Sequence, residues 1–199
     1  MTTEILIQFG FAILTALTCW FLIRSYHETY TFSPMISKLL IGSSLVISFF
    51  FGYLQDTSNT LPVYLETLLI GPLLFLCATD LKALELPDYV NLLVGLLGVV
   101  YLIFAPFPFW SGIATSIILF VSFLLIALVS SGALGGGDIK YVLAFGLWIP
   151  PHLILPFLLF STLSASLYGL ISLVLSKKKE PLPFGPFLVL SSIYLLFIF

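Results

Sequence analysis

Eight apolar segments follow one another along this chain, separated by short polar or proline-containing connections. They cover approximately residues 4 to 24, 38 to 55, 61 to 80, 89 to 105, 109 to 130, 139 to 151, 153 to 175 and 185 to 199. The longer ones approach the roughly 20 residues that an α-helix needs to cross a bilayer. With 60% hydrophobic and only 8% charged residues, the chain does not have the composition of a soluble globular domain. We therefore expect an all-α, polytopic transmembrane helical bundle of about eight membrane segments, forming one membrane-embedded domain over residues 1–199.

Two of these segments differ from the others, the first by its flanking residues and the sixth by its length. The first is followed by Arg24 and lacks a small-residue cleavage site, so we interpret it as a retained span rather than a removed signal peptide. The sixth is short and ends at Ile149, Pro150 and Pro151. Because proline cannot continue a regular helix, we expect this segment to be tilted or broken at the prolines.

The basic residues test the count of eight crossings. If the N-terminus lies outside, all seven fall in or beside inner loops: Arg24, Lys38, Lys82, Lys140, Lys177, Lys178 and Lys179. The outer connections, at 56 to 61, 105 to 109 and 150 to 153, contain no lysine or arginine. This distribution follows the positive-inside rule for short loops. We therefore expect the N-terminus outside and both Asp80 and Asp138 at the inner, cytoplasmic face of the cell membrane.

Carboxylates at the edge of a membrane span are costly and favour a functional interpretation. Asp80 closes the third apolar run, where the negative end of a helix dipole disfavours an acid. Asp88 follows Pro87 at the start of the fourth run, and a role as a helix N-cap explains it without catalysis. Glu66 lies near the outer end of the third run, and we interpret it as an interfacial carboxylate.

A glycine-rich turn precedes the second aspartate, in the sequence Gly135-Gly136-Gly137-Asp138-Ile139-Lys140. Glycines allow positive φ angles and a close approach to a neighbouring helix or an extended peptide. Asp138 could also simply cap the segment that starts at Ile139. On local grounds, a flexible loop with a capping acid is as good an explanation as catalysis.

Two carboxylates in a poorly solvated site cannot both ionise cheaply, so they share one proton. One then acts as a general base on water and the other as a general acid, which is the chemistry of aspartic proteolysis. Such a pair titrates as a unit and needs no metal, nucleophilic side chain or cofactor. Paired acids also line the cation paths of membrane transporters and channels, so that function remains the alternative.

Three segments resemble the type IV prepilin peptidases, which are intramembrane aspartic proteases similar also to archaeal preflagellin peptidases. Asp80 to Asp88 matches D-x-x-x-x-x-(I/L)-P-D, and Gly135 to Lys140 matches G-x-G-D-(I/V/F)-K. Phe184-Gly185-Pro186, with the following Phe187 and Leu188, matches P-F-G-P-(F/Y)-L when Pro183 is included. Without the resemblance, this third segment would indicate only a helix start.

The resemblance implies that Asp80 and Asp138 are the catalytic pair of an endopeptidase. Supporting roles are implied for the other motif residues: Pro87, Asp88, Gly135, Gly137, Lys140, Phe184, Gly185 and Pro186. The implied reaction cuts a short basic leader, ending in glycine, from the hydrophobic helix of a prepilin or pseudopilin. The basic leader stays inside, in agreement with the inner position of both aspartates.

The chain departs from the family at its N-terminal end. Many bacterial members carry a cytoplasmic zinc-binding domain with two C-x-x-C pairs after the first span, and also N-methylate the product. Here about 13 residues join the first two runs, and Cys19 and Cys77 lie apart inside apolar runs. We therefore predict a peptidase without a zinc-binding methyltransferase domain, metal or cofactor, and leave N-methylation open. Besides substrate and membrane lipid we expect no nucleic-acid partner, because the net charge is −2.

Overall fold

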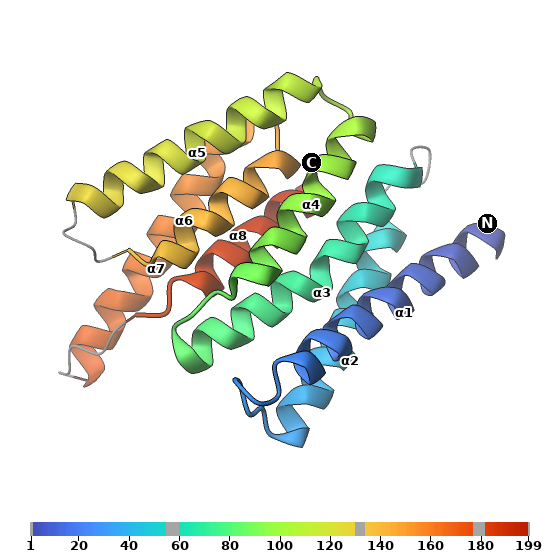
Figure 1. Cartoon of the computed structure of the whole chain (residues 1–199), viewed down its shortest axis with the longest axis horizontal. Helices are drawn as coiled ribbons and strands as arrows, with labels where there is room; N and C mark the ends of the chain where they lie inside the picture. Colours follow the sequence, from blue (N-terminus) through green and yellow to red (C-terminus); the bar gives the residue numbers. More distant parts are fainter. Residues whose placement is uncertain (1, 55–59, 130–133, 177–181, 199) are drawn as a thin grey trace.

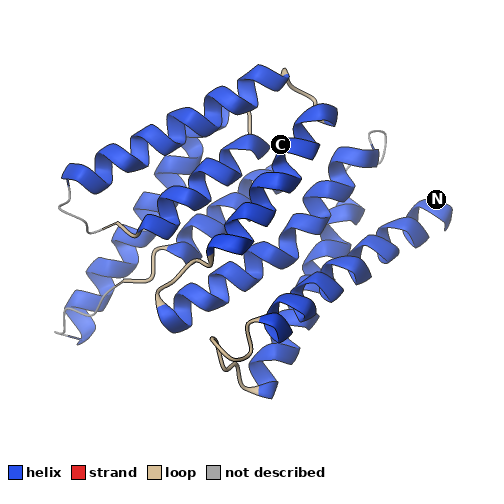
Figure 2. Ribbon diagram, in the orientation of Figure 1, coloured by secondary structure: helices blue, strands red, loops and turns tan. Residues whose placement is uncertain are grey.

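The computed structural model describes residues 2–54, 60–129, 134–176 and 182–198. Within these ranges the chain is all-helical, as predicted, with no strand (Figure 2). The described α-helices are α1 (Thr2–Ser25), α2 (Pro34–Leu54), α3 (Thr60–Ala83), α4 (Asp88–Phe104), α5 (Phe109–Val129), α6 (Gly136–Phe145), α7 (Ile154–Ser176) and α8 (Gly185–Ile198). Each apolar run of the sequence corresponds to one of them.

The chain is a multi-pass membrane protein. Five candidate spans occur in the described ranges: Leu6–Ser25, Pro34–Leu54, Leu61–Ala83, Phe109–Val129 and Pro151–Leu175. The apolar helices α4 and α8 are shorter, with 17 and 14 residues. Crossing of the membrane by α4, α6 and α8, the outside position of the N-terminus and the single-domain organisation all remain predictions.

The sixth apolar run is broken, and its helix ends before the prolines. Helix α6 has ten residues, about 15 Å, and is followed by two 3₁₀ turns, Gly146–Trp148 and Pro151–Leu153. An α-helix could not have continued through these turns, because Pro150 and Pro151 lack the N–H groups that would bond to the carbonyls of Gly146 and Leu147. The break therefore lies a few residues earlier than the prolines themselves.

Helix α3 lies at the centre of the bundle. It packs against α1 and α2 on one side and against α4 and α8 on the other, while α6 packs against both α4 and α5 (Figure 1). Large buried side chains, among them Phe75, Tyr141, Phe145 and Trp148, fill the space between these helices. Helix α3, which carries Asp80, and helix α6, which carries Asp138, thus belong to neighbouring parts of one bundle.

Glu66 is buried inside the bundle, and its expected position near a membrane interface stays a prediction. Its side chain is 7% exposed, and the hydroxyl of Tyr101 on α4 donates a hydrogen bond of 2.6 Å to Glu66 Oε1. The Tyr101 ring stacks on Trp148 at 4.8 Å between centroids. Glu66 therefore links α3 to α4 at a point distant from Asp80.

Candidate active site

Asp80 lies in the last turn of α3. The backbone N–H of Leu84 bonds to the Asp80 carbonyl at 2.9 Å, and Leu84 itself has a φ of 56°. This left-handed conformation ends the helix and costs a non-glycine residue about 1 to 3 kcal/mol. Pro87 then disfavours helical geometry at the residue before it. The motif D-x-x-x-x-x-(I/L)-P-D thus encodes a helix end, a short linker and a new helix start.

The carboxylate of Asp80 receives a hydrogen bond from the first residue of α8. Gly185 N–H donates to Asp80 Oδ2 at 2.8 Å, and the Asp80 side chain is 5% exposed. The N-terminus of α8 carries the positive end of its helix dipole, which offsets the unfavourable position of Asp80 at the C-terminus of α3. Pro186 occupies the second position of α8, where its missing N–H is not needed.

Gly185 must be glycine for this contact. A Cβ added there would lie 2.9 Å from the Cβ, Cγ and Oδ2 atoms of Asp80, closer than packed atoms can approach. The preceding Phe184 is partly buried, with its ring 6.1 Å from that of Phe123 on α5. The segment Phe184-Gly185-Pro186 therefore anchors the start of α8 against Asp80.

Asp138 lies in the first turn of α6 and is 7% exposed. The N-cap residue of α6 is Gly135, so Asp138 does not occupy the cap position that the sequence left open for it, and its carboxylate instead has a hydrogen bond to the Gly135 backbone. A Cβ on Gly137 would lie 3.0 Å from that of Leu86, so this glycine allows the turn to pack on the linker between α3 and α4. Asp138 precedes the apolar run that begins at Ile139 and lies outside the five candidate spans.

Burial, with the nearby charge of Asp80, raises the pKa of Asp138 to about 7, although a backbone hydrogen bond at Gly135 opposes the shift. Near neutral pH a carboxyl group with this pKa is protonated in about half of the molecules. The two acids therefore meet the electrostatic condition for sharing one proton.

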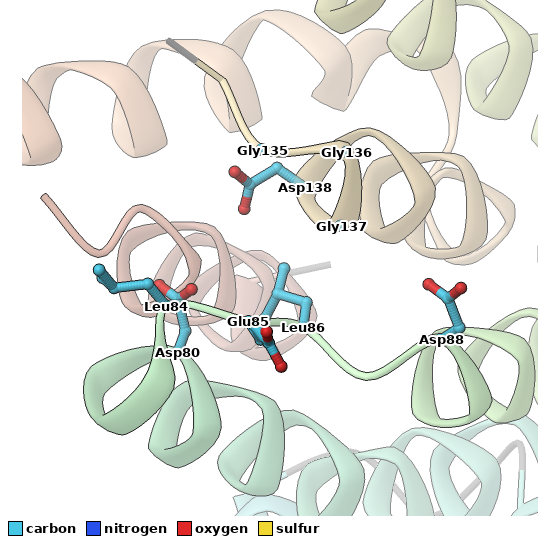
Figure 3. A pocket seen from close by; sticks show the side chains of 9 residues that line it. All are labelled: Asp80, Leu84, Glu85, Leu86, Asp88, Gly135, Gly136, Gly137 and Asp138. Carbon is cyan, nitrogen blue, oxygen red and sulfur yellow. The ribbon is translucent and has the colours of Figure 1, made fainter. Parts of the chain in front are cut away.

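Both carboxylates face one cavity of about 400 Å³ (Figure 3). They approach it from opposite walls, Asp80 from α3 and Asp138 from α6. The lining residues are Asp80, Leu84, Glu85, Leu86, Asp88, Gly135, Gly136, Gly137 and Asp138. Residues 58 positions apart in the sequence are thus brought to one space, large enough for a water molecule and a segment of extended peptide.

Asp88 lies apart from these two acids, at the edge of the cavity (Figure 3). Its predicted role as an N-cap is wrong, because Pro87 is the N-cap of α4 and no side-chain cap is present. Instead Asp88 forms an ion pair of 2.7 Å with Lys140, and both side chains are more than half exposed. The sequence did not indicate this pairing between the first and second motifs.

Further residues that no sequence motif singled out support the cavity around the linker between α3 and α4. Asn91 Nδ2 donates to the carbonyl of Gly137 at 3.4 Å, and the hydroxyl of Tyr30 donates to Glu85 Oε2 at 2.9 Å. Burial and this bond to Glu85 raise the pKa of Tyr30 to about 12, so its hydroxyl remains a donor near neutral pH. A usable signal for Asn91 was its position one helical turn after Asp88 within an apolar helix.

Residues in or beside all four predicted inner loops meet at the cavity end of the bundle. Lys82 donates to the backbone carbonyl of Thr31 in the α1–α2 loop, Lys140 pairs with Asp88, and Gly185 bonds to Asp80. Lys177, Lys178 and Lys179 lie outside the described residues. No group of three or more His, Cys, Asp or Glu side chains in the described part of the chain is arranged to hold a metal ion.

A comparison with known families gives a match over residues 67–170, to the type IV leader peptidase family. This range is more than half of the chain and contains Asp80, Asp88 and the glycine-rich turn with Asp138. The chain belongs to the type IV leader peptidase family. The match ends before Phe184, so the contact of Gly185 with Asp80 is an observation of the structure alone.

Two curated members of the family are similar to this chain. The prepilin leader peptidase/N-methyltransferase of Legionella pneumophila is 28% identical over 186 residues, which cover 87% of this chain and 62% of that protein. The protein of the same name from Bacillus subtilis (strain 168) is 27% identical over 138 residues, covering 67% of this chain and 55% of that protein. The chain thus spans less than two thirds of the length of either relative. No solved structure matches it.

Proposed function

We propose that this protein is an aspartic endopeptidase that removes the short basic leader from type IV prepilins or pseudopilins at the cytoplasmic face of the membrane. The observation that carries the proposal is the pair of buried carboxylates, Asp80 and Asp138, on opposite walls of one cavity. Membership of the type IV leader peptidase family supports the choice of substrate. The relatives' names also include an N-methyltransferase activity. The proposal does not extend to that activity, because the carboxylate pair accounts only for peptide-bond hydrolysis.

In the proposed reaction, the two carboxylates hold one proton and one water molecule between them. The ionised carboxylate takes a proton from water as the water oxygen attacks the carbonyl carbon of the scissile bond. The protonated carboxyl group donates to the carbonyl oxygen, giving a tetrahedral intermediate. Proton transfer to the nitrogen then breaks the C–N bond and frees the new N-terminus. The roles of base and acid belong to the pair and are not divided between Asp80 and Asp138.

The surroundings of the pair fit this reaction better than cation transport. Asp80 lies in the last turn of one helix and Asp138 in the first turn of another, at the same end of the bundle. Transporter sites usually lie near the middle of the membrane between broken helices. An opening at the end of the bundle is instead accessible to a leader peptide that remains in the cytoplasm.

The test is cleavage of a peptide with a basic leader, a glycine at the junction and an apolar helix, by protein purified in detergent. Asp80→Asn and Asp138→Asn keep side-chain size but remove the shared proton, so each should lower the cleavage rate by about 10²-fold or more. Glu66→Gln is the matched control, because it makes the same chemical change about 21 Å along α3 from Asp80 and should leave the rate within about twofold. A folded Asp→Asn variant cutting at the wild-type rate, or cleavage that depends on added metal, would contradict the proposal.

A further inference from the structure

An apolar groove begins beside the catalytic cavity and runs along α4, α5 and α6. Its volume is about 730 Å³, and Asp88 lines both the groove and the cavity. On α4 the groove follows one helical face, through Asp88, Leu92, Leu96 and Val99. The eleven steps from Asp88 to Val99 correspond to about 16 Å. The groove is therefore long enough for roughly three turns of a second helix.

The shape of the groove suits a helix. Its floor contains small residues from three helices, namely Gly95 on α4, Ser116 on α5 and Ala144 on α6. Its sides contain large exposed side chains, including Leu92 and Ile117. Small residues allow the backbones of membrane helices to approach closely. The space exists because α4 and α5 both pack against α6, which lies between them (Figure 1).

Asn91 is a buried polar residue in the lining of this groove, whose other lining residues are mainly apolar. Its side chain is 4% exposed, and its Nδ2 atom donates a hydrogen bond to the carbonyl of Gly137. Its Oδ1 atom has no hydrogen-bond partner among the described residues. A buried acceptor without a donor costs about 1 to 3 kcal/mol. Asn91 therefore offers an acceptor at the wall between the groove and the turn that carries Asp138.

The charges around the cavity indicate which end of a substrate would lie there. Four acids line it, Asp80, Glu85, Asp88 and Asp138. Asp88 is paired with Lys140, which lines the groove, and no lysine or arginine is found among the described residues that line the cavity. Such a site attracts a positively charged peptide segment. An acidic cavity joined to an apolar groove matches a chain in which a basic segment is followed by an apolar helix.

From these features we propose that the groove binds the apolar helix of the substrate, and that Asn91 Oδ1 accepts a backbone N–H from the segment that unwinds near the cut. This inference rests on the proposed function. Unwinding inside a membrane frees N–H groups that have no water to bond, so they need acceptors from the protein. Asn91 provides one, and its bond to Gly137 connects it to the turn of Asp138.

Photo-crosslinking tests the groove. A photoreactive amino acid replaces Leu96 in the groove, Leu81 in a second apolar hollow between α2 and α3, or Leu163 on the exposed face of α7. All three positions are highly exposed, and Asp138→Asn keeps the substrate uncut. The probe is a peptide with a basic leader, a glycine and an apolar helix of about 20 residues.

We expect the yield of the crosslinked adduct at Leu96 to be at least fivefold above that at the other two positions, and excess unlabelled peptide should remove this adduct. No adduct at Leu96, equal adducts at all positions, or a stronger adduct at Leu81 would overturn the assignment.

Ester substitutions in the same peptide test the role of Asn91. Replacing a backbone N–H with an ester oxygen, one bond at a time over the four bonds after the cut, removes one donor. At the bond recognised by Asn91, kcat/KM should fall about three- to tenfold in the wild type and be unchanged in Asn91→Ala. Equal losses in both proteins at every position would overturn the role of Asn91.

The two proposals fail in different ways. Failure of the wild type to cut the all-amide peptide contradicts the proposed function and removes the basis of the groove assignment. Cleavage with crosslinks outside the groove contradicts only the groove.

Discussion

Asp80 occupies a position where a negative charge is normally unfavourable, at the C-terminal end of a helix. The structure supplies a compensating group from the far end of the sequence, the N–H of Gly185 at the start of α8. Asp138 differs, since the N-terminus of its own helix favours an acid there. Each carboxylate thus lies beside a helix N-terminus. For Asp138 this is the N-terminus of its own helix, α6, and for Asp80 it is that of α8.

Replacing Gly185 with alanine should disrupt the site through Asp80. The added Cβ would lie 2.9 Å from three atoms of this side chain, so the carboxylate or the start of α8 must move. We expect cleavage of the leader peptide to fall by about tenfold or more, because displacements near 1 Å have effects of this order or larger. The far-ultraviolet circular dichroism spectrum should not change.

Gly42→Ala is the matched control for this variant. Among the described residues, no atom outside the adjacent backbone of α2 lies within 4 Å of a Cβ added at Gly42, and alanine is the better helix former. Its cleavage rate should equal that of the wild type. Full activity of a folded Gly185→Ala protein would show that the Asp80 carboxylate does not need its present position.

At the scale of elements, the linker between α3 and α4 holds the site together. It contacts the α1–α2 loop through Tyr30 and Glu85, the α6 turn through Leu86 and Gly137, and lies next to the start of α8 at Asp80. The motifs at residues 80 to 88 and 135 to 140 were visible in the sequence. Their partners were not, because a residue such as Tyr30 has no local pattern that distinguishes it from an ordinary loop tyrosine.

The pairing of α3 with α4 also depends on the hydrogen bond between Tyr101 and Glu66, away from the cavity. Tyr101→Phe removes the donor and leaves a buried carboxyl group without it, so we expect a loss of about 1 to 3 kcal/mol in the free energy of unfolding. The measurement is reversible unfolding of the purified protein in mixed micelles. In Tyr101→Phe combined with Glu66→Leu neither polar partner remains, and most of the loss should be recovered. A single variant as stable as the wild type would contradict this account.

For the whole molecule, the clustering of inner loops at one end of the bundle agrees with the orientation expected from the basic residues. The α1–α2 loop touches Lys82, and the turn before α6 touches the α3–α4 linker. These contacts require the loops to lie on the same side. They do not by themselves say which side of the membrane that is, for which the positive-inside rule remains the argument.

Cysteine labelling checks this orientation. Glu28→Cys lies in the α1–α2 loop and Pro106→Cys in the connection between α4 and α5, and both positions are exposed. A membrane-impermeant maleimide should label Pro106→Cys in spheroplasts and Glu28→Cys in inverted membrane vesicles. The unmodified chain, whose two native cysteines are buried or half-buried, is the blank. The opposite pattern would reverse the orientation and place the aspartates outside.

The sequence by itself determined the class of the protein and singled out the two aspartates that we propose as its reacting groups. Apolar runs of spanning length dictate membrane helices, and helix-ending proline and glycine patterns place an aspartate at each of two helix ends. These are local properties, which depend on neighbours along the chain. Only the tertiary structure decided that Asp80 and Asp138 share a cavity while Asp88 pairs with Lys140, that Gly185 bonds to Asp80, and that a groove leads to the site. Such contacts join residues about 50 to 105 positions apart, and they depend on how helices of similar composition pack, which apolar sequence alone does not specify.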